Sequence, residues 1–263
     1  MMTLAALGLL VSLAVALPVW ALSLPLRDAS LADRIWSLLI AAPVLAYAWA
    51  SAPDPRSMLM LALLLAWAVR LAVYIGLRNR GHGEDRRYRA MRERHGPGFG
   101  FKSLYLVFGL QAVLAWIVGW PVLAALAHPA PLAALDIAGA LIAAAGLAVE
   151  ALADAQLARF RRGQRSEGAV MDRGLWAWSR HPNYFGEACV WWGLGLMALS
   201  AGGWAAAWSL ASPVMMTVLL LKVSGVVLLE QDIAERRPAY RDYAARTSAF
   251  IPWPPRRGGQ RAS

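Results

Sequence analysis

The 263-residue chain is poor in charge and almost free of cysteine, and both shortages restrict what it can be. Its single cysteine, Cys189, excludes an internal disulfide framework and a cysteine-based zinc site. The four histidines are scattered and lack a metal-binding spacing, so we expect no bound metal. Only 16% of the residues are charged and 59% are hydrophobic, whereas soluble domains carry about 25% charged and about 45–50% apolar residues. This balance predicts an integral membrane protein.

The nucleotide-binding signatures of soluble folds are also missing, because the chain contains neither a GxGxxG motif nor a P-loop. Its net charge of +10 could indicate nucleic acid, but basic loops are expected in any multi-span protein. We therefore expect no nucleic-acid partner. The first apolar segment lacks a basic start and a clear cleavage site, and so it is predicted to remain as a helix rather than to be a signal peptide.

Seven apolar segments are long enough, or nearly so, for about 20 helical residues to cross a hydrocarbon core. They cover residues 3–23, 34–52, 57–76, 104–126, 131–157, 184–201 and 204–230. The loops 77–103 and 158–183 and the tail 231–263 hold eight, six and seven Lys or Arg residues, while the connections near 127–130 and 202–203 hold none. Seven spans put all three basic regions on one side, which the positive-inside rule makes cytoplasmic.

We accordingly predict an all-α integral membrane bundle of about seven transmembrane helices, with the N-terminus outside and the C-terminus cytoplasmic. It forms one domain over residues 1–263, and residues 254–263 are an irregular basic tail. Arg70 and Lys222 lie within predicted spans. Such charges are costly in lipid, so these two side chains should face the bundle interior, water or a partner.

Polar residues gather at both ends of the basic loop 158–183. Glu150 and Asp154 lie one helical turn apart on one face of the fifth span, and arginines, including Arg161, follow them. Arginine suits a phosphate because its planar fork donates two hydrogen bonds at once. A helix end with snorkelling arginines explains the same pattern without a ligand. Both interpretations stay open from the spacing alone.

The stretch SRHPNYFGE, residues 179–187, marks the predicted start of the sixth span. Asn183 at the head of a helix can cap backbone N–H groups. A helix N-terminus also favours anions, so a phosphate could bind there, with Arg180 and His181 as further donors. A cap leaves Arg180, His181 and Glu187 unexplained, and we therefore favour a ligand at this helix mouth.

Two further polar segments belong to the other basic regions. Asn79 and Arg80, directly after the third span, either form a solvated turn or cover a ligand from the side. In the tail, Tyr240 and Tyr243 lie three residues apart among arginines. An interfacial amphipathic helix explains this tail segment, as does a lid over a cofactor.

The segments RGLWAWSRHPNYFGE and YRDYAARTSAFIPWPP resemble the steroid 5-alpha-reductase superfamily. The resemblance covers roughly residues 30–255 and is closest to a broad bacterial branch of uncharacterised multi-span proteins. Sterol C14-reductases and isoprenylcysteine carboxyl methyltransferases are more distant relatives. The resemblance implies a seven-helix membrane reductase that uses NADPH to reduce a carbon–carbon double bond conjugated to a ketone. Its substrate would be a steroid-like or other lipid.

The resemblance also implies which residues bind the cofactor. The family's Asn-x-x-Gly-Glu motif contacts NADPH and matches Asn183, Gly186 and Glu187. An Asp and an Arg seven residues apart, an Asn-Arg-Gly after the third span and a Tyr near the C-terminal Ile-Pro also have counterparts here. With their neighbours, the predicted cofactor-binding residues are Asn79, Arg80, Asp154, Arg161, Arg180, His181, Asn183, Tyr184, Glu187 and Tyr243.

The substrate-activating residues depart from the family pattern. The steroid reductases carry a Gln-Glu pair on an early helix and a Tyr on the third, and these polarise the ketone. Here the early helix offers Asp33, and Tyr74 lies one turn after Arg70 on the third. We therefore predict that Tyr74, or an Asp33 kept protonated by burial, donates a hydrogen bond to the substrate carbonyl.

Two other functions stay open. The first is an S-adenosylmethionine-dependent membrane methyltransferase, whose acidic and aromatic C-terminal pattern Glu230, Tyr240 and Tyr243 loosely fit. The second is a non-catalytic lipid-binding protein that shares the fold, since a fold does not dictate a function. In all three cases, membrane lipids would surround the protein. The expected location is a bacterial inner membrane, with the cofactor site facing the cytoplasm.

Overall fold

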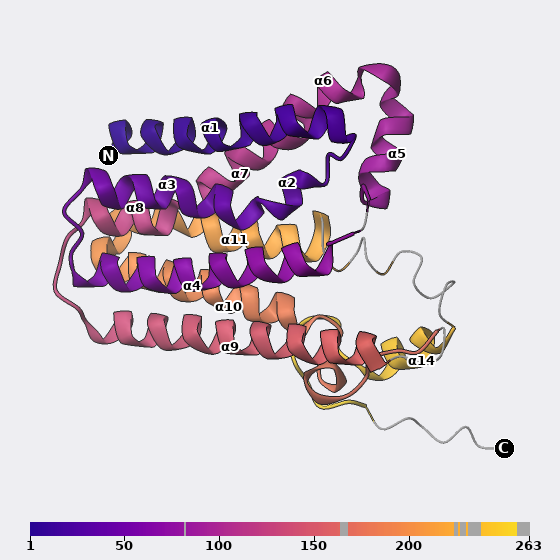
Figure 1. The fold of residues 1–263 in the computed structure, drawn as a ribbon. Helices are drawn as coiled ribbons and strands as arrows, with labels where there is room; N and C mark the ends of the chain where they lie inside the picture. Colours follow the sequence, from indigo (N-terminus) through magenta and orange to yellow (C-terminus); the bar gives the residue numbers. More distant parts are fainter. Residues whose placement is uncertain (82, 164–167, 224–225, 227–229, 231–237, 257–263) are drawn as a thin grey trace. The chain divides into compact units, whose positions relative to one another are not determined.

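The computed structural model of the chain is a set of helices, drawn in Figure 1. Among the described residues all regular secondary structure is helical, and the only β pairing is an isolated bridge between Ser179 and Ser248. The predicted all-α class is therefore confirmed. The structure describes residues 1–81, 83–163, 168–223, 226, 230 and 238–256.

The chain forms two compact units, and each is described by itself. The first comprises Met1–Ala140 with Leu194–Ser212, and the second comprises Leu141–Gly193 with Pro213–Ser263. The helices of the first unit are α1 (Met2–Leu26), α2 (Leu31–Arg34), α3 (Trp36–Ala50), α4 (Pro55–Arg78), α5 (Arg86–His95), η1 (Gly96–Gly98), α6 (Phe99–Ser103), η2 (Leu104–Gly109), α7 (Leu110–Val118), α8 (Trp120–Ala127) and η4 (Gly203–Leu210). The second unit holds η3 (Gly174–Ala177), η5 (Leu219–Val223) and α14 (Ala239–Arg246). Three helices contribute to both units, namely α9 (Ala134–Gly163), α10 (Pro182–Gly202) and α11 (Ala211–Val218).

Five helical runs of the described chain are long and apolar enough to cross a membrane, which supports a multi-pass membrane protein. They are Met2–Leu26, Pro55–Arg78, Arg86–Val118, Ala134–Gly163 and Pro182–Val223. The predicted second segment is the shorter helix α3, of 15 residues. The predicted sixth segment and residues 204–223 of the predicted seventh fall within one run of 42 residues, whereas residues 224, 225 and 227–229 of the seventh lie outside the described part of the chain.

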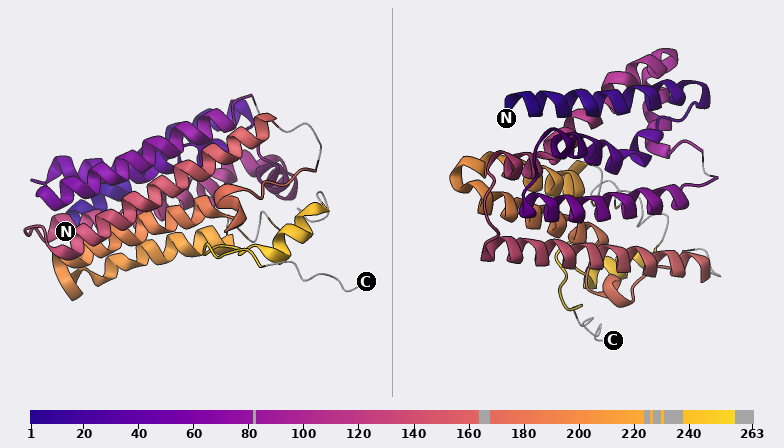
Figure 2. Two further views of the ribbon diagram at one scale, coloured as in Figure 1. Left: turned by 90° about the horizontal axis from the view of Figure 1, so that it is seen from below. Right: turned by 60° about the vertical axis from the view of Figure 1, so that its left-hand side comes forward.

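In the first unit, α3 is packed against α1, α4 and α7. Helices α1, α3 and α4 run alongside one another in the views of Figures 1 and 2. Small residues allow the close approach, because a Cβ on Gly8 would meet the ring of Tyr47. A hydrogen bond also joins α7 to α1, because Trp116 Nε1 donates to the carbonyl of Ala5 at 2.9 Å. Such interhelical contacts are typical of membrane helices, whose interfaces use small residues and hydrogen bonds.

One end of the first unit contains a buried ion pair that the sequence analysis did not anticipate. Arg56 Nε and Nη2 donate to Asp136 at 2.6 and 2.7 Å, and both side chains are buried. Asp136 also accepts bonds from the backbone N–H of Ala133 and from Ser200 Oγ. A charge within an apolar bundle needs such partners, and here they join α4, α9 and α10.

Candidate functional site

Two glycines let α9 and α10 approach each other closely in the second unit. A Cβ on Gly186 would lie 2.6 Å from the Gly146 carbonyl oxygen and 2.8 Å from the backbone nitrogen of Glu150. A Cβ on Gly146 would lie 2.5 Å from the Gly186 carbonyl oxygen. Small residues at such a crossing allow backbone contact between helices. The crossing therefore sets the distance between the polar side chains on either side of it.

Buried acidic residues lie on both helices near this crossing. Glu150 and Asp154 of α9 follow Gly146 at intervals of four residues and so share its face, and Glu187 follows Gly186 on α10. Their exposed fractions are 2%, 4% and 6%. Three carboxyl groups are seldom buried so close together, which makes this helix pair chemically unusual.

Asn183 joins the two helices through its side-chain amide. Its Nδ2 donates to Asp154 Oδ1 at 3.2 Å, so the structure brings these two predicted cofactor residues together. The Asn183 Oδ1 atom is buried and accepts no hydrogen bond from the described part of the protein. A buried acceptor without a donor is costly, and a ligand N–H or O–H group would satisfy it.

Glu230 is the centre of a second polar cluster in this unit. Its carboxylate oxygens lie 2.9 Å from Arg180 Nη1 and 2.8 Å from His181 Nε2, and Tyr240 donates its hydroxyl at 2.9 Å. Burial alone raises the pKa of Glu230, but the hydrogen bond with His181 and the charge of Arg180 outweigh it and lower the pKa below its usual range. The Arg180 charge is thus balanced by a carboxylate.

The remaining predicted residues of this unit have different positions. Tyr184 stacks on the His181 ring at 5.4 Å, so it orients that imidazole. Tyr243 is buried and donates its hydroxyl to the Trp176 carbonyl at 2.6 Å. Burial raises the pKa of the Tyr243 phenol, which therefore stays protonated as a donor. Arg161 is exposed near the end of α9.

The C-terminal segment is fastened to the residues that precede α10. The Arg180 N–H donates to the Ser248 carbonyl at 2.8 Å, and Ser179 Oγ donates to the Phe250 carbonyl at 2.7 Å. Tyr243, bonded to Trp176, is part of this attachment. The C-terminal segment is thus attached to the loop that carries Arg180 and His181.

A cavity of about 440 Å³ opens beside the same helix mouth. Gln156 provides polar lining from α9, and its Oε1 accepts the Leu175 N–H at 3.0 Å. The cavity is otherwise largely apolar. Its lining residues are Val149, Gln156, Gly174, Leu175, Trp178, Pro182, Phe185 and Pro252.

Three predicted site residues lie on α4 or directly after it, in the first unit. Tyr74 is half-buried, and the Arg78 guanidinium carbon lies 5.7 Å from the centre of its ring. Asn79 ends α4 and accepts a bond from Arg78 Nε at 3.1 Å. Arg80 is exposed. These residues form the end of the helix and the start of the loop that follows it.

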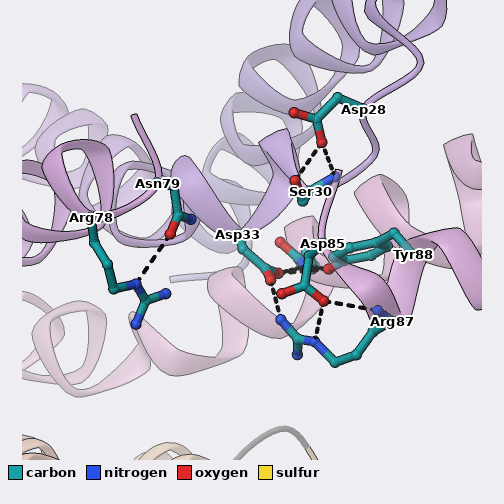
Figure 3. Close-up of polar contacts among 9 residues, drawn as sticks. Asp28, Ser30, Asp33, Arg78, Asn79, Asp85, Arg87 and Tyr88 are labelled. Atoms are coloured by element: carbon teal, nitrogen blue, oxygen red, sulfur yellow. Dashed lines mark hydrogen bonds and ion pairs between the residues drawn. The ribbon is translucent and has the colours of Figure 1, made fainter. Parts of the chain in front are cut away.

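Asp33 lies on α2 and is surrounded by hydrogen-bond donors (Figure 3). Its Oδ2 atom accepts from Arg87 at 2.7 Å, and its Oδ1 atom accepts from Tyr88 at 2.6 Å and from Gln111 at 3.0 Å. Asp33 is the acceptor in all three contacts, whereas the sequence suggested that it donates. Tyr88 and Gln111 could not be assigned to this cluster from the sequence because they lie 55 and 78 residues from Asp33.

In the comparison with known protein families, residues 19–247 match the family described as protein of unknown function (DUF1295). No curated protein and no solved structure matches the chain. The matched segment includes the head of α10, the acidic face of α9 and the Asp33 cluster. Because it spans well over half of the sequence, the chain belongs to the DUF1295 family.

Proposed function

We propose that the protein is a membrane-embedded, NADPH-dependent reductase of the steroid 5-alpha-reductase superfamily. It would reduce a carbon–carbon double bond conjugated to a ketone in a steroid-like or other lipid. The observation that carries the proposal is the Asp154–Asn183 pair at the mouth of α10, with a buried amide oxygen that lacks a donor in the described chain. The resemblance of SRHPNYFGE to the family's cofactor motif supports it.

The proposal includes seven membrane passes, with the N-terminus outside and the site at the cytoplasmic face of a bacterial inner membrane. The 42-residue run Pro182–Val223 would be roughly 63 Å long as a single helix, about twice the thickness of a hydrocarbon core. Gly203, at φ 54°, interrupts it, which supports two passes. Helix α3 is short for a span, and local thinning of the bilayer would accommodate it.

The residues of the second unit fit a dinucleotide in two respects. The free acceptor of Asn183 matches a ribose hydroxyl or the nicotinamide carboxamide, since both carry donors, whereas an ionised phosphate does not. Phosphates would be met by the exposed arginines at the end of α9, because the charge of Arg180 is already balanced by Glu230. Those arginines are Arg159, Arg161 and Arg162.

NADPH, when bound, supplies the hydride, and the protein binds, orients and excludes water. Asp154 would hold the Asn183 amide so that its oxygen faces the ligand. The segment that carries Tyr243 would keep the loop before α10 in place. For the substrate carbonyl, Tyr74 is the proposed donor, because Asp33 already accepts from three side chains.

The alternative of an S-adenosylmethionine-dependent methyltransferase is supported by one observation in the same unit. Glu150, Asp154 and Glu187 are three buried carboxyl groups, and anionic surroundings favour a sulfonium cation over a phosphate. The bond from Tyr240 to Glu230 also agrees with an acidic and aromatic C-terminal pattern. The two candidates differ in the charge of the ligand that the site should bind.

Thermal unfolding of the detergent-purified protein with NADPH, NADH or S-adenosylmethionine separates the candidates. We expect NADPH to raise the melting temperature of the wild type but not of Asn183→Ala. The matched control is Thr217→Val, which removes a 3.2 Å bond from Trp192 on the surface of the same unit. This control should keep the NADPH response. A response to S-adenosylmethionine alone would establish the methyltransferase, and no response in folded protein would leave the non-catalytic lipid-binding function.

A further inference from the structure

The cavity beside the head of α10 has walls from four segments of the second unit. They are α9, the loop that contains η3, the start of α10 and the C-terminal segment around Pro252. The Trp253 N–H donates to the Trp178 carbonyl at 2.9 Å, which ties the C-terminal wall to the loop. The rings of Phe185 and Phe250 meet edge to face, with their centres 5.8 Å apart. These contacts hold the walls in place, as is usual for a preformed ligand site.

The cavity lies on a different side of both helices from the predicted cofactor residues. On α9, Gln156 follows Asp154 by two positions, which turns it roughly 200° around the helix axis. On α10, Phe185 precedes Glu187 by two positions and is turned by the same angle. The cavity is therefore a second site, separate from the face that carries the buried acidic residues.

The lining of the cavity suits an uncharged and largely apolar group. Among the described residues that line it, none carries a charge, so a phosphate or a carboxylate would lose its solvation there without compensation. The cavity volume of about 440 Å³ falls within the range of ligand sites, about 300–1,000 Å³. A hydrocarbon chain fits both the lining and the volume.

Gln156 gives this apolar lining one oriented hydrogen-bond donor. Its Oε1 accepts the Leu175 N–H at 3.0 Å, which fixes the orientation of the amide. Gly174, at φ 59°, makes room for the amide, because a Cβ there would lie 2.7 Å from both Nε2 and Oε1. The described part of the chain provides no acceptor for Nε2. A ligand oxygen in the cavity would provide one.

Exposed apolar side chains lie at the wall of the cavity and next to it in the chain. Trp178, which lines the cavity, is 47% exposed, and Ile251 and Trp253 on either side of Pro252 are 62% and 68% exposed. Trp collects at the boundary between the headgroups and the hydrocarbon core of a membrane. The ester carbonyls of phospholipids lie at the same boundary, so these oxygens are within reach of a site at this depth.

We propose that this cavity binds one acyl chain of a membrane phospholipid, whose ester carbonyl accepts a hydrogen bond from Gln156 Nε2. The apolar lining takes the chain, and the charged headgroup stays outside because the lining offers it no counter-charge. The exposed tryptophans keep the opening at the depth of the ester groups. This site is independent of the proposed reductase, since it uses other residues and needs no cofactor.

The test compares the retention of diacyl phosphatidylethanolamine with that of its dialkyl ether analogue of the same chain length, by native mass spectrometry of the detergent-purified full chain. The ether analogue keeps the headgroup and the chains but lacks the ester carbonyls. We expect the wild type to prefer the diacyl lipid roughly fivefold, the effect of one neutral hydrogen bond. Gln156→Glu keeps an oxygen for the Leu175 N–H but removes the amide donor, and it should abolish this preference. Equal retention of the two lipids by the wild type would overturn the proposal.

A second pair of variants tests the binding of the chain without changing Gln156. Val149→Phe places a larger side chain in the cavity and should lower the affinity for both lipids roughly fivefold or more. Leu152→Phe is the matched control, because Leu152 is 50% exposed on the same helix and does not line the cavity. This control should retain both lipids like the wild type. Unchanged retention in Val149→Phe, or an equal loss in Leu152→Phe, would overturn the proposal.

Discussion

Two buried carboxylates on α9, Asp136 and Asp154, have very different surroundings. Asp136 accepts two bonds from Arg56, one from the Ala133 N–H and one from Ser200, so its hydrogen-bonding capacity is filled by the protein. Asp154 accepts a 3.2 Å bond from Asn183, whose own amide oxygen has no donor within the described structure. The first arrangement is complete and serves stability, and the second is suited to a ligand. Hydrogen-bond completeness, more than burial, separates the two roles.

Breaking the Arg56–Asp136 pair should have the largest effect on the free energy of unfolding. Arg56→Met leaves Asp136 buried without its cation, and such losses cost about 3–5 kcal/mol. Chemical unfolding of the purified protein would measure this cost. The double variant Arg56→Met/Asp136→Leu should recover much of the stability, and failure to do so would show that the pair also has a function.

Gly186→Ala should have a smaller effect on stability and should disturb the Asp154–Asn183 pair. The new Cβ would overlap the Gly146 carbonyl, and we expect a cost of about 1–3 kcal/mol together with a weaker NADPH response. Thermal unfolding with and without NADPH measures both. Gly163→Ala is the matched control, because nothing lies within 4 Å of its Cβ position, and it should behave like the wild type.

The smallest expected effect concerns the pH dependence contributed by Glu230. Its pKa is lower in the folded protein than in the unfolded chain, so its stabilising contribution is complete above the unfolded value, about 4.3. The contribution is lost as the pH falls from there through the folded pKa. The difference in stability between the wild type and Glu230→Gln should therefore stay constant well above about pH 4.3 and shrink as the pH falls below it. A difference that does not change with pH would contradict this assignment.

The sequence predicted the helical class, the membrane location and the gathering of polar residues at the head of α10. These features follow from local patterns, namely long apolar runs and a change from apolar to polar residues at a helix start. The pairing of Asp154 with Asn183 could also be predicted from the sequence. Both belong to neighbouring segments joined by one basic loop, and antiparallel helices bring the two ends of such a loop together.

The partners of the buried charges could not be predicted in the same way. Arg56 meets Asp136 across 80 residues, and Asp33 meets Gln111 across 78. In the sequence, Asp33 was a candidate acid, and only the contacts with Arg87, Tyr88 and Gln111 indicated an accepting carboxylate. A hydrogen bond depends on the positions of both partners, whereas a sequence pattern describes one segment at a time.

By itself, the sequence determined the helical class and the long apolar segments with basic regions between them. This much depends on hydrophobic transfer and backbone hydrogen bonding within each segment, and neither needs a second segment. Only the tertiary structure decided that Asp136 is fully bonded, while the buried amide oxygen of Asn183 has no donor among the described residues. These properties arise between segments, where packing selects which polar groups meet and which remain available to a ligand.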